Sequence, residues 1–82
     1  MNVAVTVAVY PLRQTDYQAI EAAIDALRSC GLLVEVQPMH TELSGPIEDV
    51  FLALRRAFEA AAHYGITVMT LTLTNACLPQ AR

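Results

Sequence analysis

The sequence has no lysine and no tryptophan, and only three of its 82 residues are glycine. Its five basic side chains are all arginine, and the formal net charge is -3, so no basic surface for nucleic acid is expected. No run of about 18 apolar residues is present, which argues against a membrane span. The N-terminus also lacks the positive start of a signal peptide. These absences predict a cytoplasmic protein that does not bind nucleic acid and does not span a membrane.

The motifs of common enzyme sites are also missing, including G-x-S-x-G, a glycine-rich phosphate loop and H-E-x-x-H. A nucleophile–base pair would have to join Cys30 or Cys77 to His40 or His63. Cys30 precedes a helix-ending glycine, which suggests a structural role. The cysteines lack C-x-x-C spacing, and the histidines lack the spacing of a zinc site. We therefore expect free thiols, no catalytic residue, no metal and no cofactor.

What the sequence does contain is apolar residues, which make up 55% of the chain against 16% charged, with a mean hydropathy of +0.41. A chain of this length forms one domain, predicted over residues 1–74, with residues 75–82 as a C-terminal tail. So small a domain needs less apolar surface than this if it is a monomer. The composition therefore predicts a homodimer or homotetramer, joined through an open sheet face and edge strands.

The first half of the chain predicts one strand and one helix. Valines alternate with small residues over residues 3–10, which is typical of a half-buried strand, and Pro11 ends it. Thr15 and Gln18 fit a capping box for a helix over residues 16–30. Gly31 suits the position just after that helix. Its predicted apolar face consists of Tyr17, Ile20, Ala23, Ile24 and Leu27.

The second half repeats the design with an added strand. Residues 32–37 and 41–43 predict two strands joined as a hairpin near residues 38–40. Pro46 suits the first position of a helix capped by Ser44 or Gly45 and ended by Gly65. Its predicted apolar face consists of Ile47, Val50, Phe51, Leu54, Phe58 and Ala61. Residues 66–74 alternate again and predict the last strand.

The order βαββαβ predicts an α+β, ferredoxin-like fold, in which a four-stranded antiparallel sheet carries two helices on one face. The valine face of the first strand should meet the helices. The opposite face should be smooth and able to pack on another sheet. We expect it to hold Ala4, Thr6, Ala8, Tyr10, Thr70 and Thr72.

Three features could be either structural or functional. The threonines near the chain end are good strand formers, and their hydroxyls could also line a polar cleft. Tyr10 at a strand end could pack in an interface or stack on a flat heterocycle. His40 could be an exposed turn residue or a ligand contact, whereas His63 is expected on a solvated helix face.

Four segments together resemble the thiamine/hydroxymethylpyrimidine-binding family, also called YkoF-like. They are Val9-Tyr10-Pro11-Leu12, the central Gly31-Leu32-x-x-Glu35-Val36-x-Pro38-Met39-x-Thr41, Gly45 before Glu48-Asp49-Val50-Phe51, and Gly65 before the last strand. The similarity spans about residues 3–74. Ser44 stands where the family usually has an acidic residue, and Glu42 is a candidate substitute.

The resemblance implies a ferredoxin-like protomer that forms dimers or dimers of dimers and binds thiamine or its hydroxymethyl-pyrimidine precursor without catalysis, in vitamin salvage or transport. It implies ligand contacts by Tyr10, Met39 and Thr41, to which the turn position adds His40. Met39 is an adaptable apolar wall, and an aromatic ring attracts a thiazolium cation. The alternative is a regulatory or protein-interaction module that senses another metabolite. A small acylphosphatase-like hydrolase ranks last, because Arg13 lacks flanking glycines.

Overall fold

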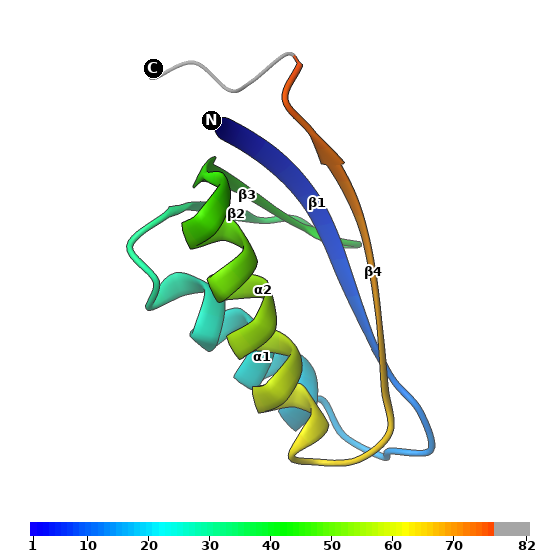
Figure 1. Ribbon diagram of the computed structural model, residues 1–82. Coiled ribbons are helices and arrows are strands. Elements are labelled where there is room, and N and C mark those ends of the chain that lie inside the picture. Colours follow the sequence, from blue (N-terminus) through cyan, green and yellow to red (C-terminus); the bar gives the residue numbers. More distant parts are fainter. Residues whose placement is uncertain (77–82) are drawn as a thin grey trace.

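The computed structural model describes residues 1–76 and contains one antiparallel sheet with two helices (Figure 1). The strands are β1 (Asn2–Pro11), β2 (Leu33–Val36), β3 (Thr41–Pro46) and β4 (Thr67–Thr74). The helices are α1 (Gln18–Arg28) and α2 (Ile47–Ala62). The strand order is β2-β3-β1-β4, and both helices cover the same face of the sheet. The predicted α+β, ferredoxin-like arrangement is confirmed.

The core lies between this sheet face and the helices. Val3, Val5 and Val7 of β1 are buried there, as the alternation predicts, and Leu43 of β3 is buried beside them. The helices contribute mainly small side chains, so they can approach the sheet and each other closely. Their buried apolar residues are Ala19, Ala23, Leu27, Val50, Ala53, Leu54, Ala57 and Ala61.

The other face of the sheet, called here the open face, carries the residues that alternate with the core valines. Directly paired residues of neighbouring strands share a face. Thr6 pairs with Glu42 on β3 and with Thr72 on β4, and Tyr10 pairs with Val68. The predicted composition of this face is therefore confirmed. Its members are Ala4, Thr6, Ala8, Tyr10, Leu33, Glu35, Glu42, Ser44, Val68, Thr70, Thr72 and Thr74.

The start of α1 differs from the sequence prediction. The helix begins at Gln18, so Thr15 lies too far away to form the capping box. Instead, the Gln18 N–H donates to Oδ1 of Asp16 at 3.1 Å. Tyr17 precedes the helix and is exposed rather than part of its apolar face, whereas Ala19 is buried. The predicted capping box is therefore wrong, and Asp16 satisfies a backbone donor in its place.

The start of α2 also differs, because pairing with β1 extends β3. Ala4 pairs with Ser44 and Val3 with Gly45, which keeps both predicted capping residues in the strand. The helix begins one residue after Pro46, at Ile47. The Ile47 N–H donates to the Met1 carbonyl at 2.9 Å. The first N–H of the helix is therefore satisfied by the Met1 carbonyl, just before β1. The predicted capping by Ser44 or Gly45 is wrong.

The buried side of α2 is occupied by alanines rather than by its phenylalanines. Ala53, Ala57 and Ala61 are fully buried, whereas Phe51 is 49% and Phe58 40% exposed. The sequence alone favoured the larger apolar residues because burial area rises with side-chain size. Val50 and Leu54 fill the rest of the buried side, and both phenylalanines remain partly exposed.

Further expectations concern an ion pair on α2, the cysteines, the C-terminal tail and a membrane span. The i,i+4 pair of Arg55 and Glu59 is present at 3.5 Å on the exposed side of α2. Cys30 is a free thiol whose Sγ contacts the Ala26 carbonyl at 3.1 Å. Cys77 and the predicted tail, apart from Asn75 and Ala76, lie outside the described residues. Among residues 1–76, neither helix is long and apolar enough to cross a membrane.

Candidate functional site

The middle of the open face carries a row of polar side chains. Thr6 lies at its centre, with Glu42 on one side and Thr72 on the other, and Glu35 lies beyond Glu42. Neighbouring strands are about 4.8 Å apart, so these four side chains form one row across the sheet. Ala4 and Ala8 flank the row along β1 and leave it uncovered. This arrangement can accommodate a flat ligand lying on the sheet.

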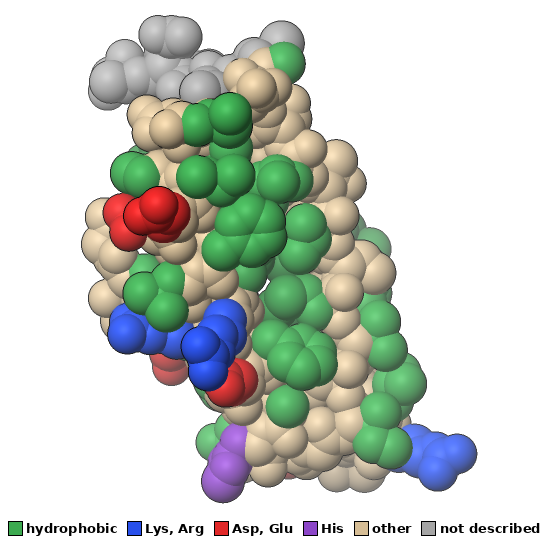
Figure 2. All heavy atoms as spheres, viewed as in Figure 1, with side chains coloured by type: hydrophobic (Ala, Val, Ile, Leu, Met, Phe, Trp, Pro, Cys, Tyr) green, Lys and Arg blue, Asp and Glu red, His purple; other side chains and the backbone are tan. Residues whose placement is uncertain are grey.

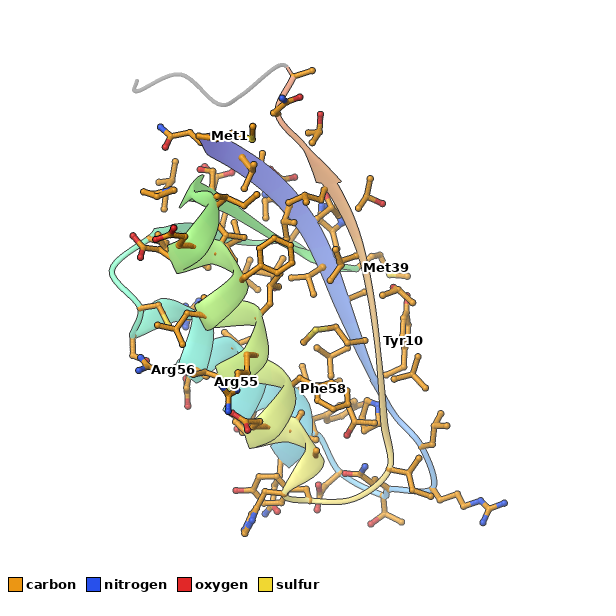
Figure 3. The ribbon with its side chains drawn as sticks, viewed as in Figure 1. Met1, Tyr10, Met39, Arg55, Arg56 and Phe58 are labelled. Atoms are coloured by element: carbon orange, nitrogen blue, oxygen red, sulfur yellow. The ribbon has the colours of Figure 1, made fainter. Side chains whose placement is uncertain are left out.

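Tyr10 lies on the same face, farther along β1. Pairing of β1 with β3 ends at Val7 and Thr41, so β1 continues past the hairpin with β4 as its only described neighbour. The Tyr10 side chain is 51% exposed. Figure 3 shows Tyr10 and Met39 on the side of the sheet away from the helices. An accessible aromatic ring with a free neighbouring position can stack on a heterocycle.

The β2–β3 turn carries Met39 and His40 beside the same face. The hairpin closes with the Gln37 N–H donating to the His40 carbonyl at 2.8 Å, and Met39 at its tip is 83% exposed. His40 Nε2 lies 3.1 Å from Glu42 Oε2. This contact holds the imidazole against the open face and orients the Glu42 carboxylate.

Thr41 is the predicted site residue that the structure does not bring to the others. Successive strand residues point to opposite faces, and Thr41 pairs with Val7 on the helix-covered side. It is only 6% exposed. The structure thus gathers Tyr10, Met39 and His40 toward the open face and places the Thr41 side chain beneath the sheet.

Glu35 is a site residue that the sequence analysis did not select. It pairs directly with Glu42, so two carboxylates lie side by side on the open face. Like charges at directly opposed positions are unfavourable for strand pairing. The pair also creates a negative local potential that attracts a cation. Alternation could have placed Glu35 on this face, but only the hairpin register shows that it faces Glu42.

A cleft lies just beyond the end of β1 that carries Tyr10, between the β1–α1 loop and the end of α2. The Ile66 carbonyl accepts hydrogen bonds from the Leu12 N–H at 2.9 Å and from Gln14 Nε2 at 3.0 Å, which ties the two loops together. The cleft is open, with a volume of about 240 Å³. Its lining is polar and consists of Arg13, Gln14, Thr15, Asp16, Gln18 and Tyr64. None of the predicted site residues lies in it.

The two histidines lie in separate surroundings. His40 is on the open face, whereas His63 ends α2 and packs edge-on against Tyr64, with ring centroids 5.2 Å apart. Within residues 1–76, no three His, Cys, Asp or Glu side chains are grouped so that they could hold a metal ion.

The element order and the covered and open sheet faces define a small ferredoxin-like domain. Residues 5–74 match the family model described as thiamine-binding protein. The chain therefore belongs to the thiamine-binding protein family.

Solved structures share this fold at low sequence identity. A protein of Streptococcus pneumoniae is 22% identical, with a TM-score of 0.85 over 90% of this chain and 86% of its own. A hypothetical protein of Methanocaldococcus jannascii is 21% identical, with a TM-score of 0.84 over 96% and 84% of the two chains. A Thermotoga maritima protein, whose name connects it with thiamine biosynthesis or salvage, is 22% identical, with a TM-score of 0.79 over 89% and 82%. No curated protein matches the chain.

Proposed function

We propose that the protein binds thiamine, or its hydroxymethyl-pyrimidine moiety, on the open face without transforming it. The carrying observation is that a member of the thiamine-binding protein family exposes an aromatic ring and two carboxylates on one uncovered sheet face. Such binding would serve salvage or transport of the vitamin in the cytoplasm. The absence of common enzyme motifs supports a binding role.

The proposed pose follows from the positions along β1. Thr6 and Tyr10 are four residues apart, which corresponds to about 13 Å along a strand, with Ala8 midway between them. The aminopyrimidine would lie over Ala8 and against Tyr10, with Met39 as a flexible apolar wall. The thiazolium ring would lie toward Glu42 and Glu35, whose negative charge favours a cation. His40 would keep Glu42 oriented.

Thr41 has an indirect role in this proposal. Its side chain packs beneath the sheet, where it supports the turn that presents Met39 and His40. Its hydroxyl would not contact the ligand. Thr41→Val therefore serves as a control that changes the turn residue but leaves the open face unaltered.

The experiment is calorimetric titration with thiamine and, separately, with hydroxymethyl-pyrimidine. Tyr10→Ala should weaken binding of thiamine by about 0.5–1.5 kcal/mol, the usual size of an aromatic stacking contact, and Tyr10→Phe should retain most of the affinity. Thr41→Val should bind like the unaltered protein. Absence of heat and of a thermal shift with both ligands at millimolar concentration would refute the proposal.

A second variant tests the pose. Glu42→Gln keeps the shape of the side chain and removes its charge, so it should weaken binding of cationic thiamine by about 1 kcal/mol. Binding of the neutral pyrimidine should change little. Equal losses for the two ligands would show that the thiazolium ring does not lie beside Glu42.

We also propose that the protein works as a homodimer or homotetramer. The open face is uncovered, and the two outer strands, β2 and β4, have unpaired edges within the described sheet. The alternative function is a regulatory or protein-interaction module for another metabolite. A co-purified small molecule other than a pyrimidine would favour it.

A further inference from the structure

The cleft beyond the end of β1 is held in shape by contacts between two loops. Figure 1 shows the β1–α1 loop and the α2–β4 loop at the same end of the molecule. The Leu12 N–H and Gln14 Nε2 of the first loop both donate to the Ile66 carbonyl of the second. A Cβ at Gly65 would lie 3.2 Å from Gln14 Nε2, so the glycine allows Gln14 to pack closely. The Thr67 hydroxyl donates to the Gly65 carbonyl at 3.1 Å, which fixes the second loop in turn.

Arg13, in the wall of this cleft, has a backbone conformation that arginine rarely adopts. Its φ is 58°, and among residues 1–76 it is the one residue other than glycine with a positive φ. The Cβ of an L-residue is unfavourable in this left-handed region, whereas glycine adopts it without that cost. Strained positions of this kind are typical of ligand-binding loops. The strain indicates that the side chain of Arg13 has a use at this position.

The two charged groups of the cleft are not neutralised by the protein. Arg13 and Asp16 both line the cleft, yet the ion pairs found within residues 1–76 lie on the open face and on the exposed side of α2. Oδ1 of Asp16 accepts the Gln18 N–H, which orients the carboxylate and leaves its second oxygen for another donor. A guanidinium and an oriented carboxylate are therefore both available to a ligand.

These groups favour a small molecule that carries both charges. A guanidinium binds a carboxylate through paired hydrogen bonds, and a carboxylate attracts an ammonium group. A simple anion would be repelled by Asp16 and a simple cation by Arg13, whereas a zwitterion satisfies both. The volume of about 240 Å³ is below the roughly 300 Å³ at which pockets for drug-sized ligands begin. The ligand must therefore be small.

We propose that this cleft is a second binding site, which takes a small polar α-amino acid in its zwitterionic form. The carboxylate of the ligand binds Arg13 and its ammonium group binds Asp16. The amide of Gln18 and the hydroxyl of Tyr64, which also line the cleft, bind a polar side chain. The Tyr64 ring is held edge-on by His63. Figure 2 shows hydrophobic side chains gathered between α2 and β4, so the polar cleft is chemically distinct from that surface.

The first test is a titration of the isotope-labelled protein followed by its amide NMR resonances, with L-serine as the probe. L-serine should shift the amides of residues 13–18 and 64–66 with a dissociation constant in the millimolar range, because a small ligand makes few contacts. L-serinamide lacks the carboxylate and N-acetyl-L-serine lacks the ammonium group, so each should bind at least tenfold more weakly. Absence of saturable shifts with L-serine would overturn the proposal. Binding of either analogue as tightly as L-serine would exclude a zwitterion site.

The second test uses variants that separate binding from stability. Arg13→Gly removes the guanidinium and the unfavourable φ, so affinity for L-serine should fall at least tenfold while the melting temperature stays constant or rises. Asp16→Asn keeps an acceptor for the Gln18 N–H and removes the charge, so it should lose affinity equally without loss of stability. Arg28→Gln, at the end of α1 and outside the cleft, is the matched control and should bind like the unaltered protein. Unchanged affinity in Arg13→Gly or Asp16→Asn, or an equal loss in Arg28→Gln, would contradict the assignment.

The same spectra distinguish this site from the proposed thiamine site. L-serine should leave the amides of Met39 and Glu42 unchanged, whereas thiamine should shift them. Shifts by L-serine confined to the open face would overturn the cleft as its site. Binding of L-serine in the cleft without thiamine binding would leave this proposal standing and refute the proposed function. Thiamine binding without L-serine binding would have the opposite meaning.

Discussion

At the scale of single residues, Gly45 shows how tightly the chain is built around the hairpin. It lies in β3 with a φ of 156°, and a Cβ added there would lie 2.6 Å from Leu32 Cδ2. Leu32 is partly buried against the core, so its side chain has to shift to admit a Cβ at position 45. A side chain at position 45 must therefore displace a neighbour that the core needs.

We predict that Gly45→Ala lowers the free energy of unfolding by about 1–3 kcal/mol, the usual effect of overpacking. Urea denaturation measures it. Gly31→Ala is the control, because position 31 has open space and only its φ of 74° opposes alanine. Combining Gly45→Ala with Leu32→Ala should destabilise less than the sum of the two single changes, because the clash is removed. Strict additivity would rule out that contact as the cause.

Single residues also show how much of the site could be predicted from the sequence. Tyr10 and the threonines were placed on the open face because alternation with buried valines fixes their direction. Thr41 was grouped with Tyr10 because the family resemblance implies ligand contacts by both. The hairpin register decides that its side chain points to the helices, and register depends on pairing between segments far apart in the chain.

At the scale of elements, α1 begins beside a side-chain carboxylate that accepts a hydrogen bond from the first N–H of the helix. Asp16→Ala should lower the free energy of unfolding by about 0.5–1 kcal/mol, because the Gln18 N–H loses its acceptor. Thr15→Ala should change stability little, since Thr15 makes no capping bond. Thermal or urea unfolding of both variants distinguishes the two caps. A larger loss of stability in Thr15→Ala than in Asp16→Ala would show that the capping box predicted from the sequence is formed.

Element order and faces followed from the sequence, whereas element ends did not. The patterns of the four strands and of the two helices predict six elements correctly, because each pattern reflects one buried face. The end of β3 and the start of α2 shifted because Met1 and Val3 pair with Ile47 and Gly45. A local pattern around Pro46 contains no information about residues at the other end of the chain.

At the scale of the whole molecule, the proposed ligand contact and the proposed self-contact differ in charge. Thiamine would bind beside Glu35 and Glu42, whereas β4 carries no charge. Raising the salt concentration from about 50 mM to about 500 mM should weaken thiamine binding about two- to threefold through screening. A dimer contact along the edge of β4, which carries no charge, should keep its dissociation constant unchanged or lower it. Titration and sedimentation at both salt concentrations check this, and the reverse pattern would exclude both assignments.

The central position of β1 has a consequence for how the molecule forms. β1 is synthesised before β2, β3 and β4, yet its pairs with β4 run from Pro11–Thr67 to Ala4–Thr74 and join nearly the two ends of the described chain. Contacts so distant in sequence form slowly because the intervening chain must first be ordered. Until β4 arrives, the even-numbered N–H groups of β1 remain open to any other strand. The sheet is therefore most vulnerable to misassembly before β4 has paired with β1.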